Sequence, residues 1–332
     1  MRKAVRIGVL VAVIGVSGAA ALYGARGDQR EVTGLSAAAA PSSGGGYTYE
    51  RLGRPARTVV RDGTGAQLAL FTDGSRTAML TGRSRTFAEP RFTEVTVTSN
   101  AWIRLAPRPW QAGAEQEKWF TDWLPKAIGD TGPDVLAVAL QYTDGAADQL
   151  SENLRVGGDA RFGPDSAEGR LEKSDFYDYL GIGWDFPGGV HEAADPVRAR
   201  SLDCSGFVRM VYGYRSGYPL LATNTKGPGL PRRAWALSEL GPGTEVIPDE
   251  KRQATDFSAL QPGDVLFFNL EPQLGPQVSH TGIYLGIDSD GHRRVLSSRK
   301  VANGPTFGDA GGVSLIDGSG TYAKAFRAAK RL

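Results

Sequence analysis

The chain has 332 residues, of which 41% are hydrophobic and 22% charged, an ordinary composition for a globular protein. Its formal net charge of +2 is too close to neutral to imply nucleic acid or an anionic membrane surface as the main partner, so no nucleic acid is expected. With one cysteine and three histidines, a metal site of several such ligands is hard to build, and we expect neither a metal nor an organic cofactor.

The N-terminus has the pattern of a targeting segment. Arg2, Lys3 and Arg6 precede an uncharged stretch over residues 7–25. We therefore predict an exported protein, extracellular or associated with the cell wall, in which residues 1–27 form a signal peptide or an uncleaved membrane anchor. Both alternatives stay open. Residues 28–46 are rich in small and polar side chains and predict a flexible linker.

Residues 47–152 predict a small β-rich domain with helices, of unknown role. Short apolar runs separated by Asp-Gly turns extend from Thr58 to Thr98 and predict strands. The spacing of Trp119, Trp123 and Leu124 then indicates a helix, and Val135–Leu140 indicates another. The tryptophans of this region could stack on sugars or build a small core, and we favour the core.

The chemistry is concentrated around the only cysteine. In Leu202–Tyr212 the apolar residues follow helical spacing, and Asp203 is a good N-cap, so Cys204 is predicted in the first turn of a helix. There the helix dipole favours the nucleophilic thiolate. Ser205 and Gly206 are small and would let a substrate carbonyl approach the backbone N–H groups. An unpaired cysteine in an exported protein is either an accident or a reactive group.

A histidine is predicted on a nearby strand. Val278–Gly286 alternates like a strand that His280 opens, after a turn and a buried strand over Gln261–Phe268. Another strand is expected from Arg294 to Arg299. A thiol nucleophile needs a base, which then protonates the leaving amine, and His280 is the candidate.

Three strings in this half of the chain carry a family resemblance. DCSGFV, QPGDVLFF and SHTGIYLG follow one another in the order and at the spacing found in NlpC-type cell-wall peptidases, which are papain-like cysteine hydrolases. The sequence looks like an exported, actinobacterial member of that family. The resemblance covers roughly Leu171–Leu332. It implies an α+β fold over residues 153–332, with helices packed on an antiparallel sheet, behind the β-rich domain.

The resemblance also implies roles for individual residues. Cys204 would be the nucleophile, His280 the base, and Ser297 would stand where the family has a polar residue, often histidine, that orients the imidazole. Serine is a departure, because it orients more weakly than a ring or an amide. Asp203 and Ser205 are candidates for substrate binding.

A second departure precedes the cysteine. The family often has a tyrosine in a Tyr-x-Trp-Gly-Gly string, and the matching stretch Trp184–Gly189 begins with tryptophan. Trp184 could still wall the cleft as a substrate-binding residue. Its N–H can only donate, which puts the tyrosine's helper role in the oxyanion hole in doubt.

The resemblance implies hydrolysis of an amide bond in peptidoglycan stem peptides, between γ-D-glutamate and a diamino acid, through a thioester. The expected partners are these stem peptides, and we expect a monomer, with membrane attachment through residues 7–25 as the open alternative. Two other interpretations remain: an amidase acting at another wall bond, and a wall-binding module that has lost activity.

Overall fold

The computed structural model describes residues 46–167 and 169–332, all of which lie within one compact unit, Ala39–Leu332. The predicted signal segment, residues 1–27, and nearly all of the predicted linker, residues 28–46, lie outside this described part. Among the described residues no helix is both long and apolar enough to span a bilayer.

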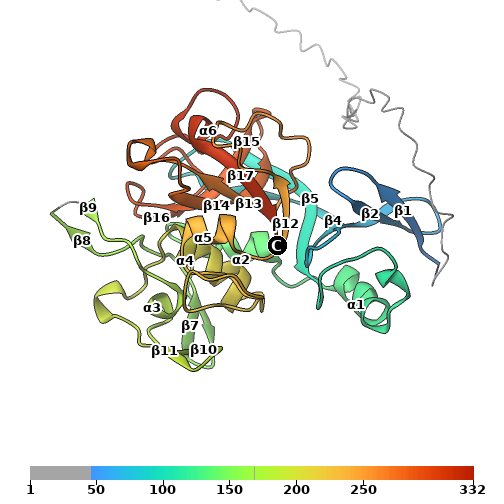
Figure 1. Ribbon diagram of the computed structural model, residues 1–332, viewed down its shortest axis with the longest axis horizontal. Coiled ribbons are helices and arrows are strands. Elements are labelled where there is room, and N and C mark those ends of the chain that lie inside the picture. The colour runs from blue at the N-terminus through green and yellow to red at the C-terminus, as the bar shows by residue number, and fades with distance from the viewer. Residues whose placement is uncertain (1–45, 168) are drawn as a thin grey trace, which may run out of the picture. The chain divides into compact units, whose positions relative to one another are not determined.

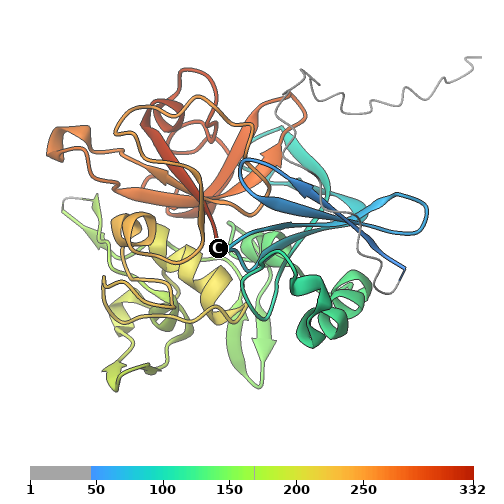
Figure 2. The same ribbon diagram turned by 45° about the vertical axis from the view of Figure 1, so that its right-hand side comes forward.

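The first part of the chain forms an antiparallel five-stranded sheet. Its strands follow one another in sequence order, and each pairs with the next: β1 (Thr48–Leu52), β2 (Arg57–Arg61), β3 (Gln67–Thr72), β4 (Thr77–Ala88) and β5 (Thr96–Leu105). Helix α1 (Lys118–Gly129) packs against this sheet (Figure 2). The strands and the helix agree with the sequence pattern, because alternating apolar residues bury one face of a sheet.

A compact aromatic core joins α1 to this sheet. Phe71 stacks on the fully buried Trp110 at 4.6 Å between ring centroids, and Phe120 of α1 lies 4.9 Å from Trp110. Trp119 and Trp123 pack against the same core from partly buried positions. Trp110, Trp119 and Trp123 therefore belong to a small hydrophobic core, the alternative that we favoured over stacking on sugars.

The second sheet has six antiparallel strands in the order β12-β17-β13-β14-β15-β16. Their bounds are β12 (Thr244–Ile247), β17 (Phe326–Arg331), β13 (Val265–Phe268), β14 (His280–Ile287), β15 (Arg293–Arg299) and β16 (Gly304–Thr306). The last strand of the chain, β17, thus lies inside the sheet. It pairs with β13 on one side and β12 on the other.

The six-stranded sheet separates two cores, because successive side chains of a strand point to opposite faces. Ile283, Leu285 and Leu296 share a core with α4 (Cys204–Val208), which lies on one side of β13 and β14 together with α5 (Ala234–Glu239) (Figure 1). Residues such as Phe268 and Tyr322 form the core on the opposite face.

The remaining elements are short. Three two-stranded ribbons are β6 (Gln149–Ser151) with β7 (Leu154–Gly157), β8 (Asp165–Ser166) with β9 (Gly169–Arg170), and β10 (Trp184–Phe186) with β11 (Val190–Glu192). The other helices are α2 (Val135–Leu140), α3 (Phe176–Leu180), α6 (Thr321–Ala325), a π-helix (Arg209–Tyr214) and 3-10 turns at Ala114–Gln116, Pro196–Arg198 and Pro272–Leu274. The mixed α and β class agrees with expectation, and the papain-like arrangement stays a prediction.

Residues on both sides of position 152 contribute to one core. Val97 and Ile103 of β5 belong to the same cluster of buried side chains as Phe207 of α4. Val97 also forms an antiparallel bridge with Asp288, at the end of β14. The domain boundary after residue 152 stays a prediction, and in this structure it would run through a shared core.

A buried carboxylate ties the first part of the chain to a loop of the second. Glu89, 5% exposed, follows β4 and accepts hydrogen bonds from the Thr306 hydroxyl at 2.8 Å and from the N–H groups of Phe307 and Gly308 at 2.9 and 3.1 Å. Arg299 holds the same loop by donating to the Gly312 carbonyl at 2.6 Å. The five-stranded part therefore helps to fix a loop beside the end of β15.

Candidate active site

Cys204 opens helix α4 because Asp203 caps it. Asp203 has extended backbone, and its carboxylate accepts a hydrogen bond from the Gly206 N–H at 2.7 Å, which satisfies one of the free donors of the first turn. The predicted position of the cysteine in the first helical turn is confirmed by this geometry. A π-helix continues the element to Tyr214.

Gly206 allows the segment before α3 to approach α4. A Cβ atom at this position would lie 2.2 Å from the carbonyl oxygen of Ser174, a distance that no side chain tolerates. The segment is pinned there by the Asp203 N–H, which donates to the Ser174 carbonyl at 2.9 Å. We expected small residues here to admit substrate, but Gly206 is buried and its size is required by packing within the protein.

A buried network of charges holds the start of α4. Arg232 donates to both carboxylate oxygens of Asp203, at 2.8 and 3.2 Å, and to the Ser205 hydroxyl at 2.8 Å. Asp175 pairs with Arg209 at 3.0 Å and with Arg232 at 3.3 Å. Burial alone would raise the pKa of Asp203, but Arg232 and the Gly206 N–H lower it below its ordinary value, so this carboxylate is ionised.

These contacts bear on two candidate substrate-binding residues. The side chains of Asp203 and Ser205 are both buried, and Arg232 binds both of them. Their first role is therefore to fix the helix start under Cys204. Both residues also line the pocket beside the thiol that contains the start of α5.

His280 is the first residue of β14, as the alternation predicted. It pairs with Phe268 of β13, and its ring lies 5.9 Å from the Phe268 ring and 5.6 Å from the Tyr322 ring. The backbone N–H of the next residue, Thr281, faces the Cys204 sulfur. Helix α4 packs against β14, and Cys204 and His280 line the same pocket.

Cys204 lies between two adjoining pockets. The first, of about 250 Å³, contains Cys204 together with His280, Arg299 and Tyr322. The second, of about 300 Å³, contains Cys204 with Asp203, Ser205 and the start of α5. A thiol between two pockets, with an imidazole in one of them, is suited to attack an extended substrate whose two ends occupy the two sides.

Both reacting groups are neutral in the free protein. Burial, followed by the Asp203 carboxylate, raises the pKa of the Cys204 thiol to about 12. Burial, followed by the Arg299 guanidinium, lowers the pKa of His280 to about 3. We expected the helix dipole to favour a thiolate. The carboxylate that caps the helix offsets that dipole, and the thiolate expectation is not met in the free state.

Ser297 does not contact the imidazole that it was expected to orient. Its buried hydroxyl accepts a hydrogen bond from the Arg299 Nε at 3.1 Å and also bonds to Tyr322. The Nε2 atom of His280 is buried and has no hydrogen-bond partner among the residues that the structure describes. The rings of Phe268 and Tyr322 pack against the imidazole and hold it in place.

The structure also places Trp184 away from the thiol. Its side chain packs edge-on against Phe176 at 5.1 Å and Tyr214 at 5.7 Å, on β10. It is not among the residues that line the two pockets beside Cys204. The expected cleft-lining role is not supported by this placement, because the ribbon of β10 and β11 directs the indole into the core.

Several site residues escaped the sequence analysis. Glu172, Arg299, Lys300 and Tyr322 line the pocket that contains Cys204 and His280. Arg299 could have been suspected from strand alternation, which puts it on the same face as Ser297. Glu172 and Tyr322 lie in segments without a recognisable pattern, so no sequence signal pointed to them.

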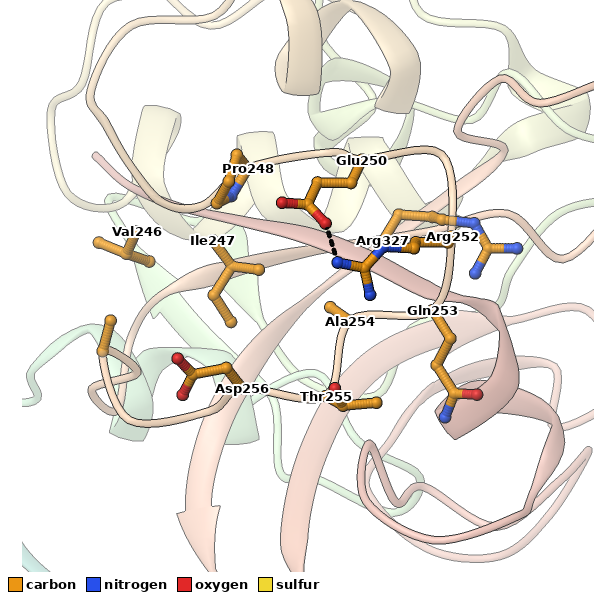
Figure 3. A pocket seen from close by; sticks show the side chains of 11 residues that line it. Val246, Ile247, Pro248, Glu250, Arg252, Gln253, Ala254, Thr255, Asp256 and Arg327 are labelled. Atoms are coloured by element: carbon orange, nitrogen blue, oxygen red, sulfur yellow. Dashed lines mark hydrogen bonds and ion pairs between the residues drawn. The ribbon is translucent and has the colours of Figure 1, made fainter.

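Other polar sites in the described part of the chain lack this chemistry. A pocket of about 200 Å³ is formed by the end of β12, the segment that follows it and Arg327 of β17; Glu250 and Arg252 line it, and it contains neither cysteine nor histidine (Figure 3). His191 and His292 pair with carboxylates, at 2.7 and 3.6 Å, outside both pockets. Among the described residues, no group of three or more His, Cys, Asp or Glu side chains could hold a metal ion.

Comparison with known proteins gives one assignment. Residues 188–326 match the NlpC/P60 family. The matched range contains Cys204, His280, Ser297 and all strands of the six-stranded sheet except most of β17, and it excludes the five-stranded sheet. No curated protein matches the chain.

Proposed function

Since residues 188–326 form an NlpC/P60 domain, we propose that this protein is a cysteine peptidase that hydrolyses stem peptides of peptidoglycan. The family supports cell-wall hydrolase activity in general. The finer assignment, to the amide between γ-D-glutamate and a diamino acid, is our proposal.

One observation carries this assignment. Helix α4 packs against β14, and the chain's only thiol, Cys204, lines the same pocket as His280. Among the described residues, neither side chain forms a hydrogen bond or ion pair with another side chain that would explain it otherwise. A nucleophile and a base within reach of each other, at a cleft, are the minimum required for acyl transfer.

The neutral resting state determines the first chemical step. As the sulfur attacks the carbonyl carbon, neutral His280 removes the thiol proton, so thiolate forms only with the new C–S bond. N–H groups in the first turn of α4 are the candidates to stabilise the oxyanion. The imidazolium then protonates the leaving amine as the C–N bond breaks.

The second half of the cycle regenerates the thiol. With His280 as the base, water attacks the thioester carbonyl, and the C–S bond breaks. His280, which has taken one proton from the water, returns it to the departing sulfur, and the product carboxylic acid loses the second proton of the water to solvent and is released as carboxylate. The thiol and the neutral imidazole are thereby restored, and no metal or organic cofactor takes part.

The location of the protein is part of the proposal. Residues 7–25, as a signal peptide or anchor, would bring the enzyme to the wall side of the membrane, where its substrate lies. We propose that it acts there as a monomer.

Incubation with purified peptidoglycan fragments, followed by mass analysis, tests the function. We expect one stem bond to yield a new amine and a new carboxylate with the full chain, and no product with Cys204→Ala. Products from an amide outside the stem would instead identify an amidase. Wall binding without cleavage, together with a thiol inert to iodoacetamide, would contradict the proposal and establish a binding module.

A further inference from the structure

One carboxylate spans the two pockets beside the thiol. Glu172 lines both of them. Its carboxylate lies 2.7 Å from Nζ of Lys300, which lines the pocket of His280, and 3.6 Å from the guanidinium of Arg233, which lines the pocket beside α5. Glu172 thus links a cation on each side of Cys204.

The backbone of Glu172 is fixed relative to the nucleophile. Arg198 donates a hydrogen bond to its carbonyl, and the N–H of the following Lys173 donates to the Asp203 carboxylate at 2.9 Å. Asp203 directly precedes Cys204. These bonds hold the Glu172 main chain beside the cleft, whatever its side chain does.

The side-chain contacts, by contrast, are easily exchanged. The exposed fractions are 45% for Glu172, 47% for Lys300 and 31% for Arg233. Ion pairs this exposed contribute little to stability, because water screens them and ordering two long side chains is unfavourable. A carboxylate supplied by a ligand could therefore replace that of Glu172 at either cation.

We propose that Lys300 and Arg233 recognise carboxylates of the substrate on the two sides of the scissile amide, and that Glu172 occupies both cations until substrate displaces it. This inference rests on the proposed function and names its substrate class, a peptide that carries free carboxylates near the cleaved bond. A γ-linked glutamate has such a group, because its α-carboxylate takes no part in the amide.

Binding to the Cys204→Ala full chain tests the proposal without catalysis. The probe is a γ-D-glutamyl–diamino acid peptide measured by calorimetry, beside the same peptide with its carboxylates amidated. We expect Glu172→Gln to tighten binding of the free acid roughly threefold or more, and Lys300→Gln and Arg233→Gln each to weaken it by a similar factor. Affinity for the amidated peptide should change little in all three variants.

Glu50→Gln is the matched control. Its carboxylate forms an exposed ion pair with Arg61 at 2.9 Å on the five-stranded sheet, so it reports the effect of losing one surface charge. If Glu172→Gln weakens binding, Glu172 itself holds a substrate ammonium group and the proposal is overturned. It is equally overturned if the free acid binds no variant, or if all three variants behave like the control.

Cleavage separates this inference from the proposed function. Should the peptide bind with the expected pattern while the chain with Cys204 intact cleaves no fragment, the proposed peptidase activity fails and the carboxylate recognition stands.

Discussion

The two reacting residues line one pocket but lie in contrasting surroundings. Around the start of α4, Arg232 pairs with Asp203 and Asp175 pairs with Arg209 and Arg232, while Asp203 caps the helix beneath Cys204. Around His280 the polar contacts are incomplete, since Nε2 lacks a partner among the described residues and Ser297 is occupied by Arg299. The nucleophile is therefore positioned by hydrogen bonds and ion pairs, and the base by packing.

This contrast separates stability from reactivity. A buried charge network contributes to the folding of one arrangement, and removing one member leaves another charge without compensation. Aromatic packing fixes where a ring lies but does little to fix which nitrogen carries the proton. Substitutions on the cysteine side should thus act mainly on unfolding, and substitutions on the histidine side mainly on the reaction.

The largest effect is expected from removing the base. His280→Gln should lower kcat/KM for peptidoglycan fragments by about 10²–10⁴-fold, because general acid–base catalysis contributes about that much. Steady-state kinetics by product mass measure it. His292→Gln, at a partly exposed site outside both pockets, is the control and should keep wild-type activity. Equal losses in both variants would rule out a specific role for His280.

On the cysteine side, Asp203→Ala should destabilise the fold by about 3–5 kcal/mol, because it removes the cap and leaves Arg232 buried with one carboxylate fewer. Urea unfolding followed by tryptophan fluorescence gives the change in free energy of unfolding. Glu50→Gln should change it by less than about 1 kcal/mol. A cost for Asp203→Ala no greater than that of the control would refute the view that the network holds α4.

The depressed pKa of His280 also predicts how stability depends on pH. Its pKa is about 3 in the folded protein and 6.5 ordinarily, so the unfolded chain binds the proton more readily. The contribution of neutral His280 to the stability of the fold is fully present above pH 6.5 and is lost as the pH falls toward 3.

At pH 4 the titration of His280 should lower the free energy of unfolding by about 3 kcal/mol relative to neutral pH. His280→Gln cannot take up that proton. The difference in stability between wild type and this variant should therefore change by that amount between pH 7 and pH 4 in urea titrations. Parallel pH curves for the two proteins would show that His280 titrates normally.

The smallest effect is expected at Ser297. Since its hydroxyl bonds to Arg299 and Tyr322 rather than to the imidazole, Ser297→Ala should change kcat/KM less than roughly tenfold, in line with the loss of one hydrogen bond. The pH profile of activity should keep its shape. A loss as large as that of His280→Gln would mean that Ser297 orients the base during the reaction.

Sequence patterns located the local parts of this site. The cap at Asp203, the helix that Cys204 opens and the strand that His280 opens all follow from spacing within a few residues. The family strings added roles for these residues. What the sequence could not supply were contacts between distant segments, such as Glu172 with Lys300, or Arg232 with Asp203, because only the tertiary fold brings them together.

Two of the mismatches, at Trp184 and at the Cys204 thiol, have the same origin. Trp184 was expected to line the cleft because it occupies the tyrosine position of a family motif. In the structure its indole packs against Phe176 and Tyr214 instead. The thiolate was expected from the helix dipole alone. Burial and, after it, the carboxylates of Asp203 and Glu172 raise the pKa of Cys204, and both effects depend on where other segments pass.

The neutral thiol has a consequence for the lifetime of the enzyme. Oxidants such as peroxide attack thiolates, and the products beyond sulfenic acid are not readily reversed. With the pKa of Cys204 raised to about 12, very little of the resting protein presents a reactive sulfur at neutral pH. An enzyme that ionises its nucleophile only during attack on substrate would keep its one thiol intact where no reductant is at hand.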